Sequence, residues 1–354
     1  MKADVKMLIK EGRLEITMGG WVGADEDDAN YEDLIGNFQK GHKWILDEFN
    51  TTARVGWNVD PFGHTEGNAA LFHDFGFDAL FFSRSNAKNV KDRWANRGSH
   101  FLWRPFSNHF GKQKEILTGL ISDGVQGYGY NKGFTYDDDT DAGQNDEDTG
   151  IQDDPTLAGF NAEALIARLV NQVHVVANGT ASNENVMYLY GDDFSWSNAY
   201  ALYNNLDKMI KYGNLYNKHN ITFVMSTPSR YVDALQAENV TWPVMYDDLA
   251  VYNQFDYDKK GVSDNQFWTG YYSSRPDFKR QIKVASSEYY AASKLHAKMV
   301  INNKLSDKEI NEVLGQNDAL LGEVSVCQHH DAVAGTSMQH VANDYQFKLA
   351  KAQS

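Results

Sequence analysis

The sequence predicts an α/β fold, because short apolar runs typical of strands alternate with longer segments of helical periodicity. The strand-like runs lie at residues 54–59, 79–83, 101–103, 186–190 and 221–226. Segments with apolar residues three and four positions apart occupy most of the intervals, at residues 31–49, 162–178 and 200–217. This alternation favours a largely parallel sheet or a (β/α) barrel.

From residue 273 onward the pattern changes to long helical stretches with no strand signal between them. These stretches cover residues 276–299 and 306–321. We therefore place a domain boundary near Phe267. The prediction is an α/β barrel-like domain over residues 1–266 and a helical-bundle domain over residues 267–354.

The composition indicates a folded, acidic protein. The chain has 354 residues, of which 42% are hydrophobic, and a formal net charge of -15. Such a chain is repelled by nucleic-acid phosphates and by anionic membrane surfaces, so we expect neither as a partner. No stretch approaches the roughly 20 apolar residues of a membrane-spanning helix. The single cysteine, Cys327, leaves His, Asp and Glu as the candidate metal ligands.

Four N-glycosylation sequons begin at Asn50, Asn178, Asn220 and Asn239. In a secretory protein these positions would lie on the surface. Sequons also arise by chance from ordinary Asn and Thr usage. Two interpretations therefore stay open at this point, the secretory pathway or a coincidence of composition.

The first candidate catalytic residue is Asp60, which follows a strand-like run and precedes Pro61. Proline disfavours helix immediately before it, so the carboxylate should lie where a strand opens into a loop. That edge is where α/β proteins build their sites. An isolated Asp-Pro pair is more often a turn or a helix cap, so this motif alone does not establish a catalytic role.

Two further carboxylates, Asp192 and Asp193, follow the apolar run at residues 186–190. Adjacent like charges at the end of a strand are unfavourable unless they are solvated, paired or bound to a metal. One of the two could then have a raised pKa, which suits a general acid. A solvated loop is the alternative interpretation.

The third cluster contains His329, His330 and Asp331, shortly before Gly335. Adjacent side chains on a regular helix point about 100° apart, so both histidines can serve one site only where the backbone breaks, as this glycine permits. Neutral imidazole and carboxylate are the zinc ligands that remain when cysteine is absent. A histidine pair on the surface is the alternative.

Together these clusters make the sequence resemble family 38 glycoside hydrolases, the lysosomal and Golgi class II α-mannosidases, and most closely the lysosomal branch. The similarity extends over almost the whole chain. The segments that carry it, besides the three clusters, are Gly12-Arg13-Leu14-Glu15, Gly19-Gly20-Trp21-Val22, Pro61-Phe62-Gly63-His64, Gly76-Phe77-Asp78, Phe81-Phe82-Ser83-Arg84 and the runs at residues 267–276 and 339–345.

The resemblance implies a zinc-dependent, retaining α-mannosidase that hydrolyses terminal α-linked mannose from oligomannose or N-glycan-derived oligosaccharides. Asp60 matches the family's nucleophile, which is also a zinc ligand. His330 matches a zinc-binding histidine, and Asp193 matches the general acid/base. The residues expected to contact the sugar are Phe62, Arg84, Tyr130, His329 and Asp331. The implied location is the lysosome or vacuole, or the exterior after secretion.

The sequence departs from the family at one important position. Family members carry a His-x-Asp motif on the first barrel strand, which supplies two further zinc ligands, and no such motif lies upstream of Gly12. We therefore expect a fragment that lacks the first strand of the barrel and the later β-domains of the family. Two other functions stay open, a non-catalytic sugar-binding remnant and a metal-dependent deacetylase-like hydrolase, although the latter gives Asp193 no role.

Overall fold

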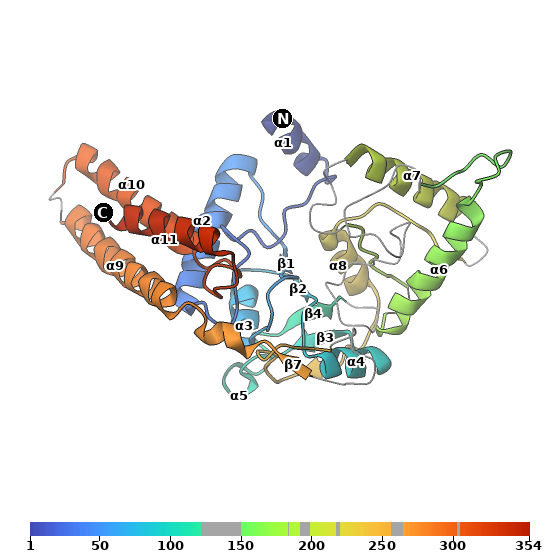
Figure 1. Ribbon diagram of the computed structural model, residues 1–354, viewed down its shortest axis with the longest axis horizontal. Helices are drawn as coiled ribbons and strands as arrows, with labels where there is room; N and C mark the ends of the chain where they lie inside the picture. Colours follow the sequence, from blue (N-terminus) through green and yellow to red (C-terminus); the bar gives the residue numbers. More distant parts are fainter. Residues whose placement is uncertain (122–149, 183, 192–198, 217–219, 256–264, 303–304) are drawn as a thin grey trace. The chain divides into compact units, whose positions relative to one another are not determined.

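The computed structural model describes residues 1–121, 150–182, 184–191, 199–216, 220–255, 265–302 and 305–354 (Figure 1). The chain forms two compact units. Unit 1 comprises Met1–Ala87, Leu102–Thr118 and Val244–Ser354. Unit 2 comprises Lys88–Phe101 and Gly119–Pro243.

The described strands include a five-stranded sheet in the order β1-β2-β4-β3-β5. These strands are β1 (Val55–Trp57), β2 (Ala79–Phe82), β3 (His100–Trp103), β4 (Ile116–Leu120) and β5 (Val244–Met245). β1 runs parallel to β2, and β3 runs parallel to β5. Every residue of β2 and β4 is buried, as is usual for parallel strands. The predicted α/β fold with parallel strands is confirmed, and closure of the sheet into a barrel stays a prediction.

Unit 1 contains the helices of both ends of the chain. They are α1 (Lys2–Lys10), α2 (Tyr31–Phe49), α3 (Glu66–Asp74), α5 (Ser107–Phe110), the 3-10 helix η3 (Thr269–Ser273), α9 (Pro276–Ile301), α10 (Asp307–Val326) and α11 (Gln339–Gln353). A hairpin of β6 (Asn253–Phe255) and β7 (Asn265–Phe267) precedes η3. Helix α10 packs against α2, α9 and α11 (Figure 1). The predicted division at residue 266 stays a prediction.

Local sequence signals explain where several of these helices begin and end. α9 has Pro276 in its first turn, where a backbone N–H has no helical partner to lose. α10 begins with a capping box, in which Ser306 accepts from the backbone of Glu309 and the Glu309 carboxylate accepts from the backbone of Ser306. α2 ends at Asn50 in the left-handed conformation. The predicted helix at residues 31–49 is therefore confirmed with its bounds.

Unit 2 contains α4 (Ala87–Ala95, whose first residue belongs to unit 1), α6 (Ala162–Asn178), α7 (Ala199–Leu215) and α8 (Pro228–Ala237). α6 and α7 confirm two predicted helices. The predicted strands at residues 186–190 and 221–226 are wrong, because the structure assigns no strand to either run. Their apolar side chains, such as Val186 and Phe223, pack on the α6–α7 core. The apolar character of these runs therefore reflects packing on that core and not pairing between strands.

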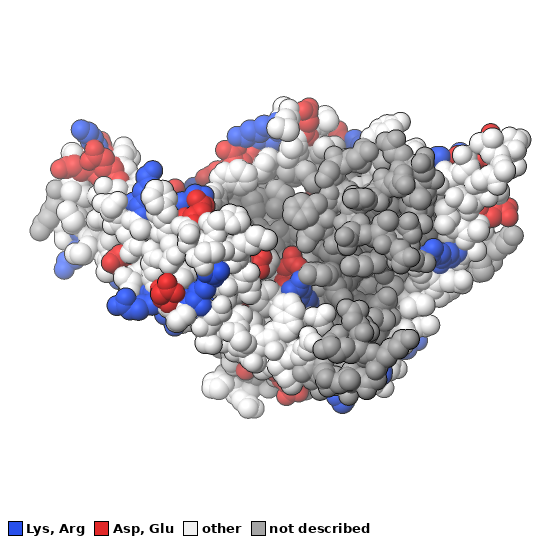
Figure 2. All heavy atoms as spheres, in the orientation of Figure 1, with Lys and Arg blue, Asp and Glu red and all other residues white. Residues whose placement is uncertain are grey.

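Three surface properties concern the expected partners: exposure of the sequons, the distribution of charge and the hydropathy of the helices. The four sequon asparagines are all exposed. On the face drawn in Figure 2, acidic and basic side chains of the described residues are interspersed over the helices α9 to α11. Within the described part of the chain, no helix combines the length and the apolar character needed to cross a bilayer.

Candidate active site

Asp60 lies where β1 opens into a loop. The backbone that follows β1 stays against β2, because Asn58 N donates to the Phe81 carbonyl (2.8 Å) and Ser83 Oγ donates to the Val59 carbonyl (2.6 Å). The two strands are parallel, so Asp60 lies at their carboxyl end. α/β proteins place reactive groups at this edge. The predicted position of Asp60 is confirmed, and its role as nucleophile stays a prediction.

The loop that carries this carboxylate is fixed on both sides. It turns at Gly63, where φ is +124°. His64 and Leu249 then exchange two backbone hydrogen bonds, both 3.0 Å long. Thr65 caps α3, and its hydroxyl oxygen accepts from Asn68 N at 3.1 Å. These contacts limit the positions that the loop can adopt.

We expect Gly63→Ala to destabilise the protein by about 3 kcal/mol or more. A Cβ at this position would overlap the Ala250 carbonyl oxygen and Asp27 Oδ2, so the backbone would have to move. The matched control is Gly76→Ala, because Gly76 also has a positive φ, +86°, but no atom within 4 Å of an added Cβ. The control should cost only about 1 to 2 kcal/mol. Equal shifts of the two denaturant midpoints would contradict a tightly packed loop.

His330 belongs to the C-terminal part of unit 1 and lies close to Asp60. Its backbone N and its ring Nδ1 both donate to the Gly23 carbonyl, at 3.2 and 2.8 Å. A β-bridge between Ala24 and His329 fixes the same pair of segments. His330 Nε2 lies 3.8 Å from Asp60 Oδ2, and the two side chains are 15% and 32% exposed. The structure therefore brings together the two residues that the sequence suggested as metal ligands.

The donor chemistry at this pair fits a zinc ion. Because the Gly23 carbonyl can only accept, His330 Nδ1 carries the hydrogen, and in the neutral imidazole the lone pair of Nε2 is then available to a metal on the side of Asp60. Two ligands each about 2.1 Å from one zinc ion lie no more than about 4.2 Å apart. The observed separation of 3.8 Å satisfies that limit.

Arg84 and Phe62 lie on the other side of the Asp60 carboxylate. Arg84 Nη2 is 3.5 Å from Asp60 Oδ1, and its guanidinium carbon lies 5.5 Å from the ring centroids of Phe62 and Trp268. Phe62 is buried and packs edge-on against Tyr271, with centroids 4.8 Å apart. The half-buried Trp268 ring beside this cation and carboxylate is a suitable surface for a sugar ring.

His329 and Asp331 flank His330, as expected. The rings of the two histidines have centroids 4.2 Å apart. Burial lowers the pKa of His329 to about 4, so this imidazole is neutral at higher pH, and its Nδ1 accepts from Asp331 N at 3.1 Å. Asp331 Oδ1 accepts from the Thr336 hydroxyl at 2.7 Å. Among the described residues, His329, His330 and Asp331 each have a metal-ligating atom within 4.8 Å of those of the other two.

Two predicted site residues, Asp193 and Tyr130, lie outside the described residues. The distance between Asp60 and Asp193 decides whether a two-carboxylate mechanism is possible. Their pairing therefore stays a prediction. The predicted residues that the structure brings together are Asp60, Phe62, Arg84, His329, His330 and Asp331.

An acidic segment behind the site, residues 25–28, was not predicted. Asp25 and Glu26 are 1% and 5% exposed. The hydroxyl groups of Tyr271 and Tyr272 donate to the carboxylate of Asp27, at 2.9 and 2.7 Å. One signal was present in the sequence, because four consecutive acidic residues directly follow an apolar stretch. Such a run, if buried, requires hydrogen-bond or charge partners. The partners themselves could not be identified from the sequence.

We expect stability to fall as the pH rises from about 4 to about 7. Burial raises the pKa of Asp25 to about 7 and that of Asp27 to about 6. In this window the folded protein holds protons that the unfolded chain releases, so ionisation favours unfolding. For Asp25 the loss is on the order of 4 kcal/mol. Denaturant midpoints at about pH 4.5 and about pH 7.5 measure the effect.

Asp25→Asn provides the control for this prediction, because the amide oxygen can still accept from Asp27 N or Asp28 N, as Asp25 Oδ2 does at 3.0 and 2.5 Å. The variant should have a smaller difference between the two midpoints. A wild-type midpoint that rises between the two pH values would show that the burial of these carboxylates is not the dominant effect.

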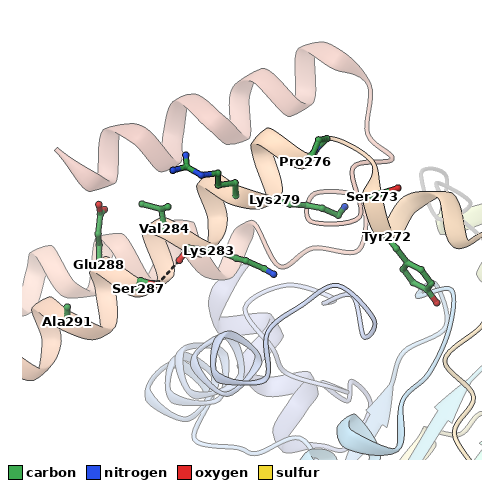
Figure 3. A pocket seen from close by; sticks show the side chains of 10 residues that line it. Tyr272, Ser273, Pro276, Lys279, Lys283, Val284, Ser287, Glu288 and Ala291 are labelled. Atoms are coloured by element: carbon green, nitrogen blue, oxygen red, sulfur yellow. Dashed lines mark hydrogen bonds between the residues drawn. The ribbon is translucent and has the colours of Figure 1, made fainter.

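A groove of about 750 Å³ runs along α9 (Figure 3). Tyr272 and Lys279 are among its lining residues. Lys279 Nζ donates to the Val333 and Ala334 carbonyls, at 2.6 and 3.1 Å, and lies 3.0 Å from the carboxylate of Asp28. This lysine therefore ties the acidic segment to the backbone that follows the histidines. None of the predicted site residues that the structure describes lines the groove.

The fold and the site define an α/β protein with a carboxylate–imidazole pair at the carboxyl end of its parallel strands. The N-terminal domain of glycosyl hydrolases family 38 matches residues 1–255, and the alpha mannosidase middle domain matches residues 266–354. The chain belongs to glycosyl hydrolase family 38.

Individual relatives agree with this assignment. An α-mannosidase of Arabidopsis thaliana is 36% identical over 350 residues, which are 99% of this chain and 31% of the relative. The lysosomal α-mannosidase of Homo sapiens is 31% identical over 350 residues, or 98% of this chain and 32% of the relative. The chain thus spans about a third of the length of these relatives. An α-mannosidase structure from Enterococcus faecalis, 15% identical, matches 99% of this chain and 34% of its own with a TM-score of 0.67, which supports the fold.

Proposed function

We propose that this protein is a zinc-dependent, retaining α-mannosidase that removes terminal α-linked mannose from oligomannose or N-glycan-derived oligosaccharides. Membership of the family and the names of the relatives support the activity. The observation that carries the proposal is the position of Asp60 at the end of β1, 3.8 Å from His330 Nε2 and 3.5 Å from Arg84 Nη2.

In the proposed reaction, an Asp60 oxygen attacks the anomeric carbon while the bond to the departing oxygen breaks, which leaves a covalent mannosyl ester. Asp193 protonates the departing oxygen in this step. It then takes a proton from water, whose oxygen displaces Asp60 from the anomeric carbon. Two successive inversions retain the configuration of the sugar.

Asp60 and His330 would hold the zinc ion, which when bound supplies a Lewis acid for sugar hydroxyl groups. Arg84 orients the Asp60 carboxylate through its guanidinium group. Trp268 provides the apolar wall that excludes water from one side of the sugar, and the buried Phe62 ring supports it at a centroid distance of 5.3 Å. His329 and Asp331 extend the polar side of the same site.

We further propose that the protein acts in the lysosome or vacuole. Relatives from Dictyostelium discoideum and Homo sapiens are named lysosomal. The exposed sequon asparagines suit a protein glycosylated in the lumen. The buried carboxyl groups of unit 1 favour stability at acidic pH. The names of these relatives do not support secretion.

The proposed architecture is a barrel-like catalytic domain over residues 1–266 and a helical-bundle domain over residues 267–354. The two family matches, which end at residue 255 and begin at residue 266, support this division. The sugar-binding remnant and the deacetylase-like hydrolase have no specific observation in their favour.

The direct test is hydrolysis of a nitrophenyl α-mannoside by the full chain, before and after treatment with a chelator. We expect release of nitrophenol, loss of release after chelation, and recovery when zinc is added back. The corresponding nitrophenyl β-mannoside is the control and should stay intact. Binding of mannose without turnover would indicate the sugar-binding remnant, and turnover of an acetylated sugar alone would indicate the deacetylase-like hydrolase.

A further inference from the structure

Glu26 lies behind the site and has no part in the chemistry proposed above. Its carboxylate is 5% exposed and accepts from three donors. Oε1 is 2.6 Å from Asn58 Nδ2 and 2.9 Å from His64 Nδ1, and Oε2 is 3.0 Å from Thr65 N. The two oxygens of one carboxyl group thus serve all three donors.

The three donors enclose the segment that carries Asp60. Asn58 precedes it, and His64 and Thr65 follow it, so one carboxylate holds both ends of the loop. Asn58 and His64 are themselves 3% and 0% exposed, and the His64 ring packs on Phe82 with centroids 4.1 Å apart. A displacement of Glu26 would therefore be transmitted directly to the loop.

The backbone next to Glu26 holds the other half of the site. Asp25 N donates to the Gln328 carbonyl at 2.9 Å, and the Gly23 carbonyl accepts both donors of His330. Residues 23–26 thus contact both halves of the site. The Glu26 side chain contacts the loop that carries Asp60, and backbone atoms of Gly23 and Asp25 contact His330 and Gln328. The separation of Asp60 and His330 depends on this segment.

We propose that Glu26 is a positioning residue that sets the distance between the Asp60 carboxylate and His330 Nε2. The proposal rests on the proposed function, in which these two groups share a zinc ion. Glu26 acts through the hydrogen bonds to Asn58, His64 and Thr65 and does not contact the sugar. Its loss should reduce both zinc affinity and the rate of the chemical step.

The test is Glu26→Gln in the full chain. Glutamine keeps the size of the side chain but accepts at only one atom, so at least one of the three donors must lose its acceptor or reorient. We expect kcat for the nitrophenyl α-mannoside to fall about 10- to 100-fold and the zinc Kd to rise by a similar factor, as for other residues that orient metal ligands. KM should change by less than about 3-fold, because the sugar contacts remain.

Asp33→Asn is the matched control. Asp33 is also a buried carboxylate of unit 1, and it accepts from the Ser286 hydroxyl at 2.6 Å, away from the Asp60 loop. The amide oxygen of this variant can still accept from Ser286, so the variant should keep the wild-type kcat and zinc Kd. If Glu26→Gln does not fold, Asn58→Ala removes one of the three donors and should change both constants in the same direction.

The proposal would be overturned if Glu26→Gln or Asn58→Ala lowered the denaturant midpoint but left kcat and the zinc Kd at their wild-type values. A wild-type chain without mannosidase activity would instead refute the proposed function. The zinc Kd would still show in that case whether Glu26 positions Asp60 beside His330.

Discussion

Asp60→Asn should lower kcat for an α-mannoside by at least about 10⁴-fold, because the amide cannot act as the nucleophile and is a poorer zinc ligand. The fold should remain, since an amide has nearly the same size and the side chain is 32% exposed. Steady-state kinetics with the nitrophenyl α-mannoside measure the loss. The denaturant midpoint shows whether the variant is folded.

Asp78→Asn is the control for this variant. Like Asp60, Asp78 lies beside a strand of the parallel sheet and pairs with an arginine, with its Oδ2 2.8 Å from Arg54 Nε. Its side chain is 38% exposed, so loss of the pair should cost little. Comparable rates for Asp60→Asn and the wild type would remove Asp60 from the mechanism.

His330→Ala should weaken zinc binding by more than about 100-fold, because it removes a metal ligand and not only a group that orients one. Activity should fall with zinc occupancy and recover partly at high zinc concentration. Equilibrium titration with zinc gives the Kd, and the rate at saturating zinc separates occupancy from chemistry.

The matched control for the histidine is His73→Ala. His73 lies near the end of α3, and its Nδ1 is 3.4 Å from the carboxylate of Asp74. This variant should bind zinc like the wild type. Unchanged zinc affinity in His330→Ala would show that the carboxylate–imidazole pair is not the metal site.

The sequence could predict those parts of the fold that depend on local signals. α2 was predicted with its bounds because its apolar periodicity is continuous over residues 31–49. The position of Asp60 followed from an apolar run before a proline, which is also a local pattern. By contrast, residues 186–190 form an apolar run like that of a buried strand, but the structure assigns them no strand, and Val186, Tyr188 and Tyr190 pack on the core of α6 and α7. Periodicity reports burial and does not identify the partner.

The site itself could be predicted only in part. The resemblance to family 38 identified Asp60 and His330. The local sequence alone favoured a turn at Asp60, and it left open a surface histidine pair at His330. The support of these residues could not be found in this way, because it depends on contacts between distant parts of the chain. Tyr271 and Asp27, for example, are 244 positions apart.

The acidic segment illustrates the same limit. No role was predicted for residues 25–28 from the sequence. In the structure, Glu26 accepts from Asn58, and Asp28 pairs with Lys279 at 3.0 Å. Glu26 and Asp28 are therefore supported by donors from other segments of the chain.

If Asp60 is the nucleophile of a retaining mannosidase, the reaction passes through a covalent mannosyl ester of Asp60. A fluorinated mannosyl fluoride slows the second step of such a reaction and lets the glycosyl-enzyme accumulate. Mass spectrometry of the digested protein should then find one mannosyl group, attached to the peptide that contains Asp60. A label on another carboxylate, or turnover of the reagent with no covalent adduct and with inversion at the anomeric carbon, would show that Asp60 is not the nucleophile of a retaining enzyme.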